Sequence, residues 1–340
     1  MAACMLAGRG VRTLMVDKSR SGRWKVCGCC LGGLGQAVLR NAGLGHVLEH
    51  ARPIDRLALA AMGARATVPF HGFVSLARED MDAAIVSAAE DAGVQTRWNT
   101  SATIDSDGTA RLKSNESLRA RVIIDATGLR GQRTEQDRVA RNTRIGLGLT
   151  TDTVGCSAGT LTMAVSRGGY VGRVALPDGR VDFAAAVSPH YVRSHGSPAK
   201  AVRSIWSHAG LDQREVPEGQ WRGTPALTRR RQVQEGRILR VGDAAGYVEP
   251  FTGEGMSWAL LSGARIAEDA LACIERGPAA SNWTDTIGAL LGRRHARCRI
   301  VSRLVRRPSV VAMSARVCTL TPRLSSMGIA AMTGTRGAVA

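Results

Sequence analysis

The spacing of apolar residues predicts a chain in which strands and helices alternate. Short continuous apolar runs at 11–16, 121–124 and 238–241 are typical of buried strands. A stretch with apolar residues at helical spacing, 256–272, follows the last of these runs after a Gly/Pro loop. On the same grounds we predict helices at 2–8, 32–48 (with a break at Gly43), 75–92 (capped by Ser75), 283–304 and 310–320.

A second group of segments alternates apolar and polar residues, and this pattern predicts antiparallel strands. The segments are 54–59, 66–70, 160–166, 168–176 and 180–187, with a hairpin turn at Pro177-Asp178-Gly179. A smaller three-stranded meander is predicted at 94–98, 100–105 and 110–113, with its turn at Asp107-Gly108. The chain thus combines buried strands and helices with a separate antiparallel sheet.

The strand–loop–helix unit at 238–270 is the most informative stretch. The strand stops at Gly242 and Asp243, and Pro250, Gly253 and Gly255 form an open loop before the helix. Free backbone N–H groups at a helix start bind anions or electron-rich oxygens. Asp243, at the strand end, is placed to accept a hydrogen bond from a hydroxyl group. A strand–turn–helix corner without a ligand is the alternative.

The N-terminal segment has the pattern of half a dinucleotide-binding unit. A helix, a glycine turn and the strand 11–16 lead to Asp17, and an acid at this position usually binds ribose hydroxyls. The strand and Gly-x-Gly-x-x-Gly turn that begin such a unit are missing ahead of it. We therefore expect a gap beside the strand 11–16, and interpret the N-terminus as truncated or misassigned.

Several motifs, taken in order, resemble those of one family. The string Gly242-Asp243-Ala244-Ala245-Gly246, with Pro250, Gly253, Gly255 and Met256 after it, resembles the second flavin motif of the FAD-dependent monooxygenase and geranylgeranyl reductase superfamily, which has the p-hydroxybenzoate hydroxylase fold. Asp125-Ala126-Thr127-Gly128 is similar to its third flavin signature. Arg78 and Asp82 match an Arg-x-x-(Leu/Phe)-Asp element, with Met81 in place of Leu/Phe. Lys25, Cys27 and Gly28 match a Lys-x-Cys-Gly element of the reductase-like branch.

The resemblance implies the fold class and the cofactor. The class is α/β (α+β), with an incomplete Rossmann-like FAD-binding domain, an inserted antiparallel substrate sheet and a C-terminal helical region. The FAD-binding domain would occupy 1–50, 76–145 and 236–277. The substrate sheet would occupy 51–75 and 146–235, and the C-terminal helical region 278–340. FAD would be bound noncovalently and reduced by transiently bound NADPH or NADH. The implied FAD-binding residues are Asp17, Lys25, Cys27, Gly28, Arg78, Asp125, Gly128, Gly242, Asp243, Ala244, Pro250, Gly253, Gly255 and Met256.

Three functions remain open on this sequence. The first is an NAD(P)H-dependent monooxygenase that hydroxylates a small organic, aromatic or polyketide-type, substrate. The second is a geranylgeranyl reductase-like enzyme that reduces an isoprenoid double bond; the Cys27 element favours it, whereas the family's Tyr/Trp/Phe-Pro substrate motif is not evident. The third is a truncated, non-catalytic relative. Weak candidates for a catalytic side chain are Cys27, which could line the cavity or react as thiolate, and Tyr170.

Composition bears on nucleic-acid binding, location and metal binding. The 340 residues carry a net charge of +18, but only 4% are aromatic and no nucleic-acid-binding motif is found, so we favour an Arg-rich solvated surface over nucleic-acid binding. Peripheral contact of the basic C-terminal region with anionic lipid is the minority interpretation. No apolar run has the length of a membrane span and no signal peptide is evident, which makes cytoplasm the default location. The eight cysteines lack the spacing of a zinc site, and we expect reduced thiols and no metal.

Overall fold

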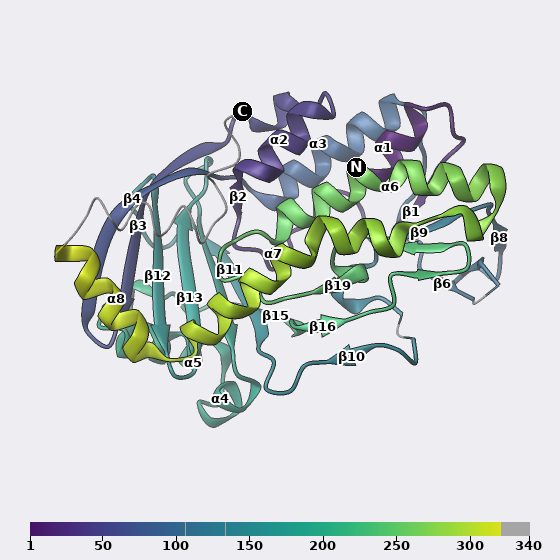
Figure 1. Cartoon of the computed structure of the whole chain (residues 1–340). Helices are drawn as coiled ribbons and strands as arrows, with labels where there is room; N and C mark the ends of the chain where they lie inside the picture. The colour runs from purple at the N-terminus through teal and green to yellow at the C-terminus, as the bar shows by residue number, and fades with distance from the viewer. Residues whose placement is uncertain (106, 133, 321–340) are drawn as a thin grey trace.

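The computed structural model describes residues 1–105, 107–132 and 134–320. Two lobes lie side by side (Figure 1). One lobe contains a large sheet, and the other contains helices packed over short parallel strands. The helices of the second lobe are α1 (Ala2–Ala7), α2 (Gly33–Asn41), α3 (Arg78–Asp91) and α6 (Gly255–Arg276), and α7 (Trp283–Val305) runs from this lobe toward the sheet, where α8 (Pro308–Leu320) follows.

The large sheet has eight strands in the order β15-β11-β14-β13-β12-β3-β4-β2. Their bounds are β2 Cys30–Gly32, β3 Arg52–Ala61, β4 Ala64–Ser75, β11 Ile145–Thr151, β12 Thr160–Ser166, β13 Gly169–Ala175, β14 Val181–Val187 and β15 Arg222–Ala226. Successive side chains along a strand point to opposite faces. Val171, Phe183 and Val187 therefore pack against α5 (Pro198–His208), whereas Met163 and Tyr170 share a core with Val311 of α8. The short α4 (Pro189–Ser194) precedes α5.

Within the large sheet β3 and β12 run parallel, so the predicted antiparallel pattern does not hold for this pair. Two further parallel pairs form separate small sheets. β1 (Leu14–Val16) pairs with β5 (Gln95–Arg97), and β18 (Ile238–Arg240) pairs with β9 (Ile123–Asp125) and, antiparallel, with β17 (Gln234–Glu235). Within the described residues, β1 has no second strand partner. A gap beside β1 was expected from the sequence. The remaining short strands are β10 (Arg138–Val139), β16 (Arg229–Arg230) and β19 (Gly246–Tyr247), which form one small sheet.

Two local predictions are wrong. The meander consists of β6 (Ala102–Ile104), β7 (Thr109–Leu112) and β8 (Ser117–Arg119), because residues 95–97 instead pair in parallel with β1. Ser75 does not cap the following helix: it is the last residue of β4, and α3 begins three residues later with Ala77 at its N-cap and no side-chain cap. Both differences arise from pairing with distant segments, which local patterns do not specify.

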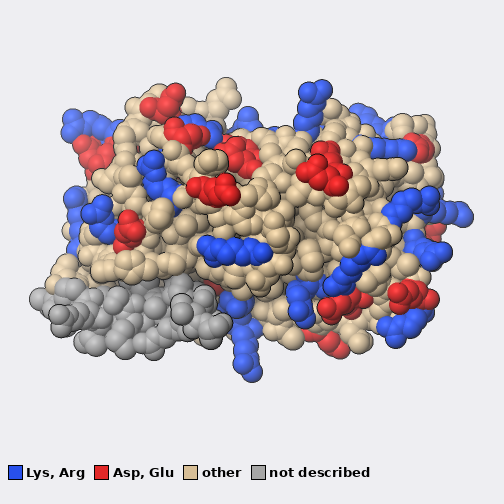
Figure 2. Space-filling view, turned by 90° about the horizontal axis from the view of Figure 1, so that it is seen from above, with Lys and Arg blue, Asp and Glu red and all other residues tan. Residues whose placement is uncertain are grey.

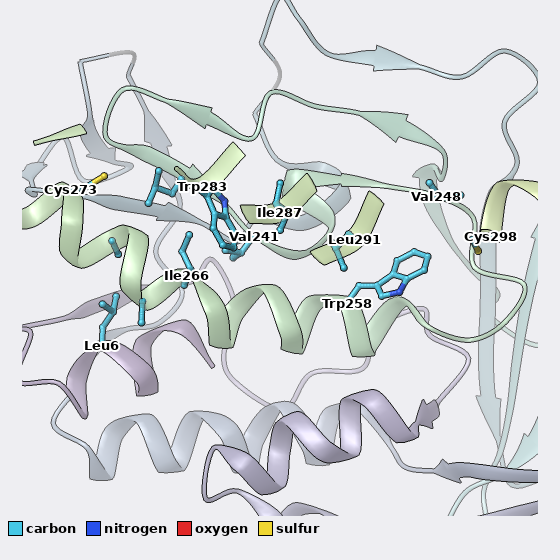
Figure 3. Close-up of a cluster of buried hydrophobic side chains, with 13 residues drawn as sticks. Leu6, Val241, Val248, Trp258, Ile266, Cys273, Trp283, Ile287, Leu291 and Cys298 are labelled. Carbon is cyan, nitrogen blue, oxygen red and sulfur yellow. The ribbon is translucent and has the colours of Figure 1, made fainter. Parts of the chain in front are cut away.

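A buried cluster around α6 holds the helical lobe together (Figure 3). Ile266 and Ala270 of α6, Leu239 of β18 and Trp283 of α7 are almost completely buried. The indole Nε1 of Trp283 donates a hydrogen bond to the carbonyl of Arg240 (2.8 Å), so the cluster fixes α7 against the end of β18. This arrangement places the N-terminus of α6 at the boundary with the large sheet.

The charge distribution partly corrects the expectation of a solvated Arg-rich surface. On the face shown in Figure 2, basic and acidic side chains are interspersed. Arg229 and Arg231 are nevertheless buried (5% and 8% exposed), and both donate hydrogen bonds to the carbonyl of Leu129. These two arginines therefore tie β16 to the loop after β9. None of the helices within the described residues is long and apolar enough to cross a membrane.

Candidate active site

A cavity of about 850 Å³ lies where the two lobes meet. Its walls come from both lobes. The helical lobe contributes polar side chains, namely Asp17, Lys25, Arg78, Asp82 and Asp243. The large sheet and the two C-terminal helices contribute apolar side chains, including Leu59, Leu161, Met163, Val174, Val305 and Val311. The cavity therefore joins a charged region to an apolar one, and no group of described residues has the composition of a metal site.

Strand alternation selects which sheet residues face the cavity. Tyr170, Gly172 and Val174 occupy alternate positions of β13, and all three line the cavity. Asp182 and Ala184 do so from β14. In the antiparallel register, Asp182 lies beside both Val174 and Thr150. One face of the sheet thus presents a single carboxyl group among small and apolar residues.

The corner at the start of α6 exposes backbone to the cavity. Gly128, Gly242 and Gly253 line it with φ angles of +69°, +57° and +73°, a region that favours glycine. The N–H of Gly242 donates to the hydroxyl of Ser262 (2.9 Å), which anchors the strand end on α6. A Cβ at Gly255 would lie 2.8 Å from the hydroxyl oxygen of Tyr247, so a larger residue would displace the helix start.

Asp243 is a half-buried acid on this corner. Burial raises the pKa of its carboxyl group, while Arg78, Arg229 and Arg231 oppose that rise. The carboxyl lines the cavity close to the first residues of α6. It therefore presents a hydrogen-bonding group where the helix presents free N–H groups.

Asp82 holds two basic side chains in place. The Nε of Arg78 donates to its Oδ1 and the Nζ of Lys25 to its Oδ2, both at 2.7 Å. Burial opposes the ionisation of Asp82, but Arg78 and Lys25 outweigh it and hold the pKa below its usual range. Because two cations share one carboxylate, the three side chains together carry a net positive charge beside the cavity.

Cys27 and Cys29 lie next to each other on the cavity wall. The backbone N–H of Cys29 donates to the sulfur of Cys27 (3.4 Å). A hydrogen bond from the Cys29 thiol lowers the pKa of Cys27 to about 6, against the effect of burial and with help from Arg78. The contact with Cys29 therefore favours the thiolate form of Cys27. The pKa of Cys29 is raised well above its usual range, because that thiol donates to Cys27 and is buried.

Asp182 is a polar site residue that the sequence motifs missed. Its side chain is buried (1% exposed), and its Oδ1 accepts a hydrogen bond from Thr150 (2.8 Å), which in turn accepts one from the indole of Trp24 (2.6 Å). Its Oδ2 has no hydrogen-bond partner among the described residues. Burial raises the pKa of Asp182 well above its usual range and thus favours its protonated, neutral form. The signal available in sequence was a lone acid in the apolar run Val181–Val187.

Tyr170 also lies on the cavity wall. Its ring packs edge-on against Phe251 (centroids 4.9 Å apart), and the Arg144 guanidinium lies 5.4 Å from the ring centroid. Burial raises the pKa of its hydroxyl well above the usual value. Tyr170 is thus neutral and held by packing.

Most of the predicted FAD-binding residues meet at this cavity. Asp17, Lys25, Cys27, Gly28, Arg78, Gly128, Gly242, Asp243, Pro250, Gly253, Gly255 and Met256 all line it. Asp125 and Ala244 do not: Asp125 is buried beside Arg240 (3.4 Å) and accepts hydrogen bonds from Thr127, and Ala244 is fully buried. These two residues are therefore buried next to the cavity wall and are not part of its surface.

Several solved structures resemble this fold, and most of those named below are flavin-dependent. A geranylgeranyl bacteriochlorophyll reductase-like protein from Thermoplasma acidophilum is 17% identical, with a TM-score of 0.78, and the alignment covers 99% of this chain and 93% of that one. The flavin-dependent brominase Bmp2 is 16% identical, with a TM-score of 0.76 and coverage of 98% and 90%. PqsL, a probable FAD-dependent monooxygenase from Pseudomonas aeruginosa, is 16% identical, with a TM-score of 0.63 and coverage of 96% and 95%. No protein-family model matches the sequence, and no curated protein does.

The chain therefore has the fold of a probable FAD-dependent monooxygenase, a flavin-dependent brominase and a geranylgeranyl reductase-like protein, as its motifs implied. The predicted α/β (α+β) class is confirmed. At these identities the likeness establishes the fold, and the activity has to be argued from the cavity itself.

Proposed function

We propose that the protein is an FAD-dependent oxidoreductase whose flavin and substrate share the cavity between the lobes. The observation that carries the proposal is the junction of a charged, backbone-lined corner with an apolar sheet face in one cavity. A dinucleotide needs hydrogen-bond donors and bare backbone along its pyrophosphate, and a ring system needs a flat apolar wall. Both kinds of wall are present.

The residues of the corner fit FAD. Gly128, Gly242 and Gly253 leave the wall without side chains, so a ligand can approach the backbone. Asp243 would accept a hydrogen bond from a hydroxyl of the ribityl chain, and Asp17 from the adenosine ribose. Arg78, held by Asp82, would face the pyrophosphate. When bound, FAD would accept a hydride from NADPH or NADH and pass the electrons on.

The sheet face would hold the substrate. Its apolar side chains exclude water from the reacting atoms, and this strengthens every polar contact inside the cavity. The neutral carboxyl group of Asp182, fixed through its Oδ1 by Thr150, would donate a hydrogen bond from Oδ2 to a substrate oxygen or nitrogen. We favour monooxygenation of a small organic substrate that carries such an acceptor.

A flavin spectrum tests the proposal directly. The purified protein should be yellow and release FAD on denaturation, and Asp243→Ala should reduce the flavin content. Asp152→Ala, at an exposed position away from the cavity, should retain it. A colourless protein that does not take up added FAD would refute the proposal. Retention of full flavin content by Asp243→Ala would remove the role of that carboxyl group.

Reduction of a double bond is the second candidate. The wall that α7 and α8 provide, with Val301, Val305 and Val311, extends the apolar part of the cavity and favours a long apolar substrate. Oxygen consumption separates the two reactions. A monooxygenase needs dioxygen for each product formed, whereas a reductase forms its product from NADPH or NADH in the absence of oxygen.

A further inference from the structure

The turn between Lys25 and β2 brings two thiols together. Cys29 has a φ angle of +48°, a left-handed conformation that non-glycine residues rarely adopt. This turn directs its N–H at the sulfur of Cys27. Its carbonyl accepts a hydrogen bond from the N–H of Leu76 (3.0 Å), so the turn is fixed against the end of β4. The strained conformation therefore keeps Cys27 and Cys29 in contact.

The two thiols differ in protonation, and a third cysteine differs from both. Cys27 and Cys29 both line the cavity, and their contact lowers the pKa of Cys27 and raises that of Cys29, so the pair favours one thiolate and one thiol. Cys30 belongs to β2, where it pairs with Ser75, and burial raises its pKa. A thiolate beside a protonated thiol is the pairing that thiol–disulfide chemistry requires, because one sulfur attacks and the other resolves the product.

We propose that Cys27 and Cys29 form a redox-active thiol pair on the cavity wall, which closes to a disulfide when a peroxide enters the cavity. The Cys27 sulfur attacks one peroxide oxygen, the O–O bond breaks, and hydroxide leaves, giving a sulfenic acid. The Cys29 sulfur then attacks the sulfur of that acid. Its proton and the departing hydroxyl form water, and the S–S bond is made.

The overall step balances. One thiolate, one thiol and one hydrogen peroxide give one disulfide, one water and one hydroxide, so the two sulfurs lose two electrons and the peroxide gains them. A thiol reductant reverses the step. A disulfide at this turn would replace the hydrogen bonds that Cys27 accepts from Cys29, and it would remove a negative charge from beside Arg78. The proposal concerns these side chains alone and holds whether or not the protein carries flavin.

Differential alkylation with mass spectrometry provides the test. The purified full-length protein is treated with hydrogen peroxide, free thiols are blocked, and peptides are mapped before and after reduction. We expect a reducible Cys27–Cys29 link that forms before Cys4 or Cys156 is oxidised. Cys29→Ala should abolish the link and leave Cys27 as a sulfenic acid that dimedone captures. Cys30→Ala, the matched control one residue away, should keep the link.

A second readout follows the thiolate itself. The rate of Cys27 alkylation by iodoacetamide should show a midpoint near pH 6, set by the pKa of about 6. Cys29→Ala should move the midpoint upward, and Cys30→Ala should not. Cys29→Ser, which keeps a hydrogen-bond donor but cannot form a disulfide, replaces Cys29→Ala if that variant does not fold. A Cys27–Cys30 link that survives in the Cys29 variants, or a Cys27 no more reactive than Cys156, would overturn the proposal.

Discussion

Replacing Asp182 by Asn should make the protein more stable at neutral pH, by an amount that depends on pH. The carboxyl group is buried, its pKa is raised well above the usual range, and its Oδ2 has no hydrogen-bond partner among the described residues. Asn has the same shape, and its amide oxygen can still accept the hydrogen bond from Thr150. The substitution therefore removes the titration and leaves the packing unchanged.

The sign follows from which state binds the proton more tightly. An Asp in the unfolded chain loses its proton near pH 3.9, whereas Asp182 in the folded protein keeps its proton to a higher pH. Between these two pKa values, the free energy of unfolding therefore falls by about 1.4 kcal/mol for each unit that the pH rises. Two pH units inside that window change the free energy of unfolding by about 2.7 kcal/mol relative to Asp182→Asn. Below both values the two proteins should differ little.

Urea denaturation at several pH values measures this difference. The free energy of unfolding of the wild type should fall below that of Asp182→Asn as pH rises from 4, with the slope given above. Asp152→Asn, at an exposed position, controls for the loss of one negative charge. A difference that does not change with pH, or a wild type that gains stability over the variant as pH rises, would refute the assignment of a neutral buried carboxyl group.

Two other substitutions test a buried ion pair and the start of α6. Glu249 is completely buried, and its Oε1 accepts a hydrogen bond from Arg144 (2.8 Å); Glu249→Gln should cost about 3–5 kcal/mol of stability, because it leaves a buried cation without its counter-ion. Thermal unfolding checks this, and a change below 1 kcal/mol would contradict it. Gly255→Ala should lower the flavin content, because its Cβ would meet the hydroxyl of Tyr247. Gly288→Ala is the control, since a Cβ there enters open space beside α7. This variant should keep the flavin and add about 0.5–1 kcal/mol of stability. Equal flavin content in the two glycine variants would contradict a role for the tight helix start.

The sequence predicted most of the secondary structure, because periodicity and turn residues act locally. Strand β12, the hairpin strands β13 and β14, and the α6 helix lie close to their predicted positions. Most residues of the predicted flavin motifs line one cavity, although Asp125 and Ala244 do not. Asp17 and Gly242 lie there because each comes just after the end of a strand of the helical lobe. The sequence did not predict pairing between distant segments. Residues 95–97 pair with β1, and Ser75 ends a strand.

The chemistry of the sheet face was also beyond local patterns. Asp182 has no motif around it, and its importance depends on a register that places it beside Thr150 and on the burial that keeps it neutral. The contact between Cys27 and Cys29 depends on a left-handed turn that the sequence does not announce. The predicted helical region 278–340 is described only to residue 320, where it forms α7 and α8.

The two walls of the cavity are built from different parts of the chain, and this separation bears on how such a protein can diversify. The charged corner comes from the residue after β1, from α3 and from the turn after β18, whereas Val305 of α7 and Val311 of α8 close the apolar part. Substitutions on these last two helices change the length and width of the apolar chamber without altering Asp17, Arg78 or Asp243. On the function proposed above, the size of the substrate and the affinity for the cofactor would therefore be set by different segments of the chain.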